Sequence, residues 1–131
     1  MLSSAEINTW EILEELGFVV KKNADRNEND ASNTIYSQYG SCNLPKIRLD
    51  FALLSANIAI EVQGDYWHAT DKSQKKLTTT QVESRLQDSY KHQLLITNGW
   101  QLITIHEKDV MTNRPRSKTH LESSILSLML V

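Results

Sequence analysis

Two carboxylates lie within otherwise apolar, strand-like segments of the chain. Asp50 stands in KIRLDFALL (46–54), and Glu61 stands in IAIEVQG (58–64). A carboxylate among apolar neighbours is costly unless it is paired or binds a cation. Hard oxygen ligands that leave coordination positions open suit Mg²⁺ or Mn²⁺. The pair therefore points to a divalent-metal site. The alternative is a half-solvated strand face that carries two ordinary surface acids.

The spacing of the two segments predicts how these carboxylates come together. Apolar residues alternate with small or polar residues in both segments, which is typical of strands, and the short SAN connection (55–57) favours an antiparallel hairpin. Side chains alternate between the two faces of a strand, so Asp50 and Glu61 share one face. Ala52, Ala59 and Gln63 lie on the same face. We expect Asp50 to lie opposite Glu61 or its neighbours.

The residues that follow the second strand add a candidate base. VQGDYWH (62–68) leaves the strand through Gly64 and brings His68 to the mouth of the sheet. Neutral imidazole is the usual general base near pH 7. The alternative is that His68 is a surface or capping histidine. Tyr66 and Trp67 are, by default, core or loop-anchoring aromatics.

A long helix is predicted over residues 80–98, and Asn98–Gly99 suits its left-handed end. Its apolar residues repeat every four positions, at Val82, Leu86, Tyr90 and Leu94. A separate polar stripe comprises Gln81, Arg85, Asp88 and His92. In the functional interpretation this stripe faces the polar side of the hairpin. The alternative is a solvent-facing stripe with a weak Arg85–Asp88 pair.

The remaining pattern predicts the rest of an α/β domain. We expect a helix over 4–16 that stops at Gly17, strands over 18–22, 34–39 and 100–106, a loop over 23–33, and a final helix over 117–130. The order of helix, strands, hairpin, helix, strand and helix predicts an α/β sandwich on a small mixed sheet.

Composition limits the classes of protein that fit. The 131 residues are enough for one domain with its own core. A single cysteine, Cys42, excludes a disulfide framework and a cysteine-based zinc site. No apolar run approaches the ~20 residues of a membrane span, and the N-terminus has no signal-peptide pattern. A net charge of −2 argues against a surface that is basic throughout, but it leaves room for a local basic cleft.

The chain resembles the PD-(D/E)XK nuclease fold, and within it the branch of very short patch repair (Vsr) endonucleases, closest to the catalytic domains of phage homing endonucleases called EDxHD. The resemblance covers about residues 4–110, and it is carried by RLDF (48–51), EVQG (61–64), YWH (66–68), Asp88 and NGWQLITIHE (98–107). It implies a restriction-endonuclease-like α-β-β-β-α-β core, with a small mixed sheet flanked by helices. It also implies one Vsr-like catalytic domain over residues 1–131, either as a whole gene product or as part of a longer protein.

The resemblance implies a catalytic role for several matched residues. Asp50 falls on the metal-binding aspartate, and His68 falls on the histidine that activates or positions the attacking water. Asp88 falls on an acid in the helix before the GW strand, and Glu6 falls on the glutamate of the first helix. Glu6 has a second explanation, because Ser3 and Glu6 have the spacing of a helix capping box.

The general nuclease skeleton also matches the second strand of the hairpin. Glu61 and the Val62 carbonyl would join Asp50 in holding the metal. Gln63 occupies the position of the skeleton's lysine, so that positive charge must come from His68 or a nearby lysine. The residues expected to contact DNA are Tyr66, Trp67, Lys72, Lys75, Lys76 and Arg85.

The resulting expectation is a Mg²⁺-dependent endodeoxyribonuclease, in which Mn²⁺ can substitute and no zinc is involved. Its expected partners are double-stranded DNA, a separate DNA-binding segment in a longer parent chain, and a second copy of the chain. We expect no membrane association and a cytoplasmic location in a bacterium or a phage-infected host. The alternatives are a mismatch-repair nicking endonuclease and a catalytically idle relative that binds DNA or a protein, for which Gln63 is the best support.

Overall fold

A computed structural model describes residues 1–40, 48–64 and 78–130. The helices in these ranges are α1 (Ser4–Glu15), α3 (Thr79–Thr97), α4 (Glu107–Thr112) and α5 (Arg114–Met129). The strands are β1 (Val19–Lys22), β2 (Thr34–Gly40), β3 (Arg48–Leu53), β4 (Ile58–Gln63) and β5 (Gln101–His106). Two short 3₁₀ turns, Asn23–Asp25 and Leu54–Ala56, connect strands.

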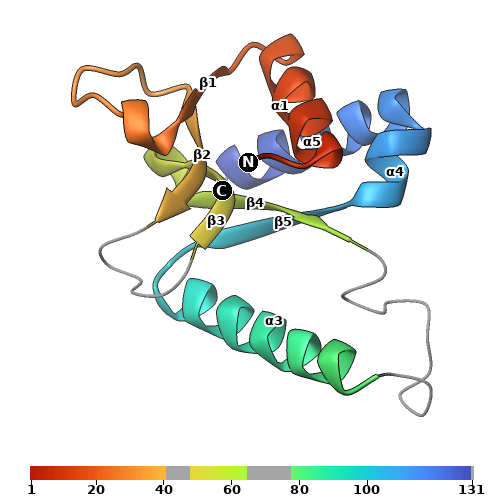
Figure 1. Ribbon diagram of the computed structural model, residues 1–131. Helices are drawn as coiled ribbons and strands as arrows, with labels where there is room; N and C mark the ends of the chain where they lie inside the picture. Colours follow the sequence, from red (N-terminus) through yellow and green to blue (C-terminus); the bar gives the residue numbers. More distant parts are fainter. Residues whose placement is uncertain (41–47, 65–77, 131) are drawn as a thin grey trace.

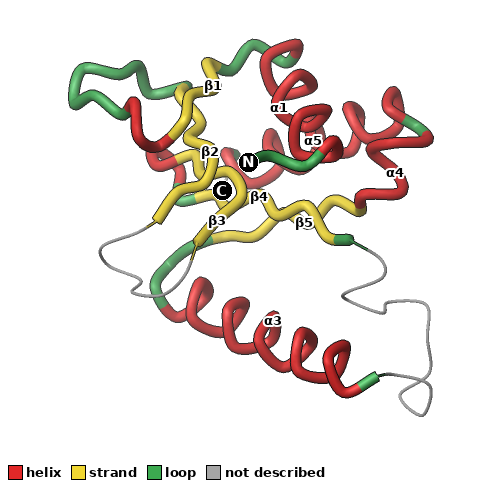
Figure 2. Tube along the Cα trace, viewed as in Figure 1, coloured by secondary structure: helices red, strands yellow, loops and turns green. Residues whose placement is uncertain are grey.

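The strands form one mixed sheet in the order β1-β2-β3-β4-β5 (Figure 2). β2, β3 and β4 are antiparallel neighbours, and the outer strands β1 and β5 each run parallel to their neighbour. The predicted α/β class with a small mixed sheet is therefore confirmed. Within the chain, α1, β2, β3, β4, α3 and β5 follow one another in the predicted α-β-β-β-α-β order.

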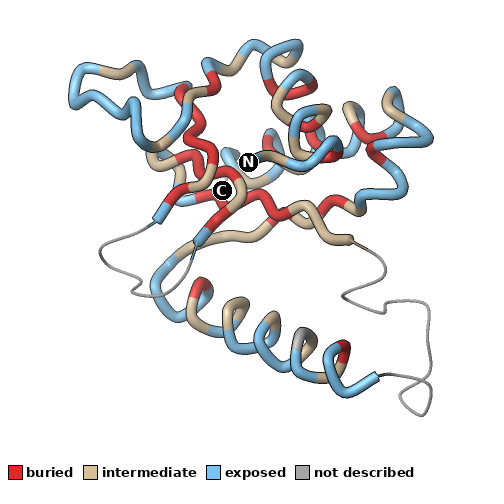
Figure 3. The backbone as a smooth tube through the Cα atoms, viewed as in Figure 1, coloured by how far each residue is buried: buried red, intermediate tan, exposed pale blue. Residues whose placement is uncertain are grey.

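Helices cover both faces of the sheet, and each face has its own core (Figures 1 and 3). On one face, α1, α4 and α5 pack on apolar strand residues, with Ile12, Leu13, Val110, Leu121 and Ile125 buried against Phe51, Ile60 and Ile105. On the other face, Leu95 of α3 is buried among Tyr36, Tyr39, Leu49, Ala52 and Ala59. The second core is smaller, and polar residues occupy much of the rest of that face.

The predicted hairpin is present in β3 and β4. Phe51 pairs with Ile60, and Leu53 pairs with Ile58. The connection is a 3₁₀ turn that ends at Asn57, whose φ of 51° lies in the left-handed region that asparagine tolerates. The same register continued by one residue sets Asp50 opposite Glu61, on the face that α3 covers.

The orientation of α3 differs from what its apolar repeat suggests. Leu86 and Tyr90 are each 66% exposed, whereas Leu95 and Gln81 are fully buried. Gln81 is tolerated inside because it belongs to a capping box: its side-chain oxygen accepts from the Thr78 N–H (3.1 Å), and its own N–H donates to Thr78 Oγ1 (3.1 Å). The polar stripe of α3 therefore faces the sheet, as the functional interpretation predicts.

The C-terminal helix begins earlier than predicted. It starts at Arg114 rather than near residue 117, and the unpredicted helix α4 precedes it. The Asn113 side chain caps α5 by accepting from the Arg116 N–H (3.4 Å), and Pro115 needs no hydrogen-bond donor in the first turn. None of the helices in the described part of the chain has the length and apolar character that a bilayer span requires.

Two leucines of α3 test this orientation directly. Leu95→Ala removes a fully buried side chain, so we expect it to lower the free energy of unfolding by about 2–5 kcal/mol. Leu86→Ala shortens an exposed side chain on the same helix, and we expect a change within about 0.5 kcal/mol. Urea denaturation of both variants measures the difference. A larger loss for Leu86→Ala than for Leu95→Ala would mean that α3 packs through its predicted apolar stripe.

Candidate active site

Asp50 makes a hydrogen bond across the end of the hairpin. The Val62 N–H donates to Asp50 Oδ2 at 2.8 Å, and Val62 lies two residues beyond Ile60, the last paired residue of β4. This bond orients the half-buried carboxylate toward β4. In an extended strand, the N–H and C=O of one residue point to the same side, so the Val62 carbonyl also faces β3. Asp50 and this carbonyl therefore lie on the same side of β4.

Glu61 is the buried acid of the pair, with 7% of its surface exposed. Burial raises the pKa of the Glu61 carboxyl to about 8, and the Asp50 carboxylate adds to the rise through its charge and a hydrogen bond. The ammonium of Lys91 opposes this rise. In the absence of a further cation, a proton on Glu61 relieves the repulsion between the two carboxylates.

Among the described residues, Lys91 on α3 pairs directly with the buried acid. Its Nζ lies 2.6 Å from Glu61 Oε1, and both side chains are largely shielded from solvent. This ion pair joins α3 to β4 across the smaller core face. It places a lysine ammonium at the carboxylates although the strand position predicted for lysine holds Gln63.

A cavity of about 210 Å³ opens where the hairpin meets α3. It is lined by Asp50, Glu61, Val62, Gln63, Asp88, Lys91 and His92. The interpretation that the polar stripe of α3 faces the two strand carboxylates is thereby confirmed for Asp88 and His92. Five of the predicted site residues meet in this cavity: Asp50, Glu61, Val62, Gln63 and Asp88.

Glu6 does not line this cavity. Its Oε1 accepts from the Ser3 N–H (3.0 Å), and its own N–H donates to Ser3 Oγ (3.1 Å), which completes the capping box of α1. Helix α1 packs on the face of the sheet opposite to α3 (Figure 1). The structure therefore accounts for Glu6 through the helix cap.

Several predicted residues lie outside the described part of the chain. They are Tyr66, Trp67, His68, Lys72, Lys75 and Lys76. Arg85 is described, is half-buried on α3, and is not among the residues that line the Asp50 cavity.

From the sequence, His92 was expected only on the polar stripe of α3 and Lys91 only on its basic surface, and neither was expected at the two carboxylates. Helical spacing could have placed both residues near Asp88, because they follow it by three and four residues and so lie on its side of α3. The sequence alone did not show which face of α3 turns toward the sheet. The apolar repeat of the helix favoured a different inward face from the one observed.

The oxygen ligands available in the cavity suit Mg²⁺ better than a metal that takes all of its ligands from protein side chains. Within the described residues, no three His, Cys, Asp or Glu side chains gather closely enough to hold a metal. Mg²⁺ is typically bound through one or two carboxylates, while waters and substrate phosphates complete its octahedron. Two carboxylates and a nearby carbonyl fit that arrangement.

Comparison with known proteins finds a nicking enzyme that is similar to part of the chain. No family model matches the chain, and no solved structure matches it. The chain is similar to the type II nicking enzyme V.HpaIIP of Haemophilus parainfluenzae, with 27% identity over 85 residues. The match covers 58% of this chain and 60% of that enzyme, so the chain spans less than two thirds of that enzyme's length.

Proposed function

We propose that this chain is a metal-dependent DNA endonuclease domain whose reaction takes place in the Asp50–Glu61 cavity. The observation that carries the proposal is the pairing of two strand carboxylates with the Lys91 ammonium in one cavity. The similarity to a nicking enzyme supports DNA as the substrate. The burial of Glu61 beside Asp50, which raises the pKa of Glu61, supports a divalent cation as the partner of the two carboxylates.

In this proposal Asp50, Glu61 and the Val62 carbonyl hold Mg²⁺, for which Mn²⁺ can substitute. The ion supplies Lewis-acid polarisation of the scissile phosphate when bound. His68 accepts the proton of the attacking water, and Asp88 orients His68 or an ordered water. Gln63 contributes hydrogen bonds at the end of β4, and Tyr66, Trp67 and Arg85 contact DNA together with Lys72, Lys75 and Lys76.

Lys91 takes the electrostatic role that Gln63 cannot fill. A fixed ammonium beside the reacting phosphate stabilises the negative charge that develops in the transition state. In the free protein the same ammonium balances Glu61. Binding of a cation to the two carboxylates would release Lys91 toward the phosphate.

The finer proposal is the catalytic domain of a homing-type endonuclease in the Vsr-like branch. A chain with a net charge of −2 gains little non-specific affinity from neutralising phosphates. Target choice therefore comes from a separate DNA-binding segment of a longer parent chain, or from a partner. A nicking endonuclease is the second candidate, because the curated relative carries that name.

Supercoiled plasmid tests both proposals. Purified protein with Mg²⁺ should convert it to open circles or linear DNA, and a chelator should prevent the conversion. Accumulation of open circles alone favours a nicking enzyme, whereas linear product favours a double-strand cutter. Plasmid that stays intact with Mg²⁺ and Mn²⁺, at protein concentrations that bind it, would favour a catalytically idle relative.

Two histidines distinguish the proton acceptor from a bystander. His68→Ala should lower the single-turnover cleavage rate by roughly 10²–10⁴-fold with little change in DNA affinity, because it removes the general base. His92→Ala is the matched control, since His92 lines the cavity on α3 but has no proposed proton-transfer role. The wild-type rate should rise with pH through the histidine range. The assignment of His68 is wrong if His92→Ala takes the rate loss instead.

A further inference from the structure

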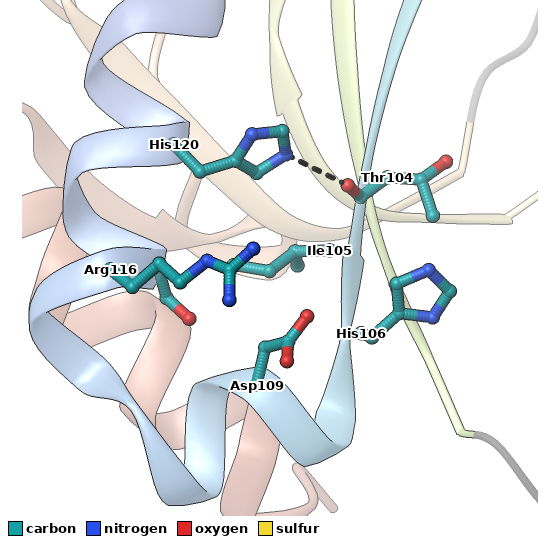
Figure 4. Close-up of a pocket in the computed structure, with 7 residues that line it drawn as sticks. Thr104, Ile105, His106, Asp109, Arg116 and His120 are labelled. Carbon is teal, nitrogen blue, oxygen red and sulfur yellow. Dashed lines mark hydrogen bonds between the residues drawn. The ribbon is translucent and has the colours of Figure 1, made fainter.

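A second cavity, of about 300 Å³, lies between the outer edge of β5 and the N-terminal half of α5 (Figure 4). Its polar lining comprises His106 of β5, Asp109 of α4, and Arg116, Ser117 and His120 of α5. In Figure 4, Arg116 and His120 extend from α5 toward β5, and Asp109 reaches toward them from α4. None of these residues belongs to the Asp50 cavity.

Two groups in this cavity lack protein partners among the described residues. Ser117 is only 2% exposed, yet its hydroxyl oxygen has no hydrogen-bond partner there. A buried hydroxyl without a partner is unfavourable, so it marks a place where a ligand atom would be stabilising. The Arg116 guanidinium likewise forms no hydrogen bond or ion pair with another described residue. His120 is held in place, because its Nε2 bonds the Thr104 carbonyl at 3.2 Å.

The chemistry of this lining favours an anion with several oxygens. A guanidinium fork and a hydroxyl donor match the oxygens of a phosphate, and the first turn of the 16-residue helix α5 adds a positive dipole. The two histidines and Asp109 do not form a metal site, because no such group of three is found in the described ranges. The negative charge of Asp109 in this lining opposes the binding of an anion. Removing that charge is therefore expected to strengthen binding, whereas removing the charge of Arg116 is expected to weaken it.

The position of the cavity connects it to the proposed active site. His106 lines it, and the register partner of His106 on β4 is Gln63, which lines the Asp50 cavity. Paired residues of neighbouring strands lie about 4.8 Å apart, so the linings of the two cavities include neighbouring residues at the carboxyl ends of β4 and β5. We propose that the Arg116 cavity binds a DNA backbone phosphate that flanks the phosphate to be cut. This inference rests on the proposed endonuclease function.

A binding titration tests the proposal in an Asp50→Asn background, which separates binding from cleavage. The probe is a random-sequence duplex, measured from low to physiological salt. Arg116→Ala should weaken binding to all sequences and reduce the slope of log K against log salt by about one. Ser117→Ala should weaken binding without lowering the melting temperature. Asp109→Asn should strengthen binding, because it removes the opposing charge.

Arg26→Ala is the matched control. Arg26 follows β1, at the opposite edge of the sheet from β5. Its substitution therefore removes the same charge far from the cavity. The proposal is overturned if Arg116→Ala and Arg26→Ala have the same affinity and salt slope. It is also overturned if Arg116 affects binding of inorganic phosphate but not of duplex. Wild-type protein that fails to cleave while Arg116 still governs DNA binding would instead contradict the catalytic assignment alone.

Discussion

Asp50→Asn is expected to abolish DNA cleavage while leaving the fold intact. The substitution keeps the shape of the side chain and its acceptor for the Val62 N–H, but it removes a charge that the cation requires. A metal contributes several kcal/mol of transition-state stabilisation, so the single-turnover rate should fall by roughly 10³-fold or more. Asp25→Asn, on the exposed turn at the far edge of the sheet, is the matched control and should cleave normally.

The same variant should be more stable than the wild type when no metal is present. The raised pKa of Glu61 means that the folded state holds a proton which the unfolded state releases above pH 4.5, so stability falls as pH rises from 4.5 toward about 8. Asp50→Asn removes one cause of that rise. The gain in melting temperature should therefore be larger at pH 8 than at pH 5. Unchanged cleavage, or a melting temperature that drops most at pH 8, would contradict the assignment.

Lys91→Met is expected to lower the single-turnover cleavage rate by roughly 10²–10³-fold at saturating metal and DNA. The substitution removes a fixed positive charge that lies beside the negative charge that develops in the transition state. Lys91→Arg should recover part of the rate, since arginine keeps the charge but not the ammonium geometry. DNA affinity should change far less than the rate, because the side chain is one of several cations that meet the backbone.

Lys22→Met, on the exposed edge strand β1, is the control for loss of one lysine. It should leave the cleavage rate unchanged. A purely structural role for Lys91 predicts a different pattern. In that case Lys91→Met would lower the melting temperature through the lost pair with Glu61, while the rate of the folded fraction would match the wild type.

The sheet and the hairpin carboxylates could be predicted because the responsible signals are local. Period-two alternation assigns Asp50 and Glu61 to one face, and a short connection permits only an antiparallel pair. The C-terminal end of α3 could also be predicted, because Asn98 and Gly99 follow the helix and Gly99 adopts a φ of 80° that favours glycine.

The sequence left two orientations of α3 open, because the choice between them depends on partners that are distant in sequence. An apolar repeat normally turns inward, but here Leu86 and Tyr90 face solvent. Leu95 anchors the helix, and the pair formed by Lys91 and Glu61 draws its polar side toward the sheet. The start of α5 was missed for a different reason. The cap at Asn113 follows directly after α4, so no loop separates the two helices.

The central claim is that Asp50 and Glu61 form a divalent-metal centre, and a crystal soaked in Mn²⁺ tests it most directly. Anomalous scattering locates Mn²⁺ without reference to activity. We expect a peak within about 2.0–2.6 Å of oxygens from both carboxylates, with Lys91 no longer paired to Glu61. We expect no peak there in Asp50→Asn crystals. Wild-type crystals at saturating Mn²⁺ that show no peak between the carboxylates, and retain the Lys91–Glu61 pair, would contradict the central claim.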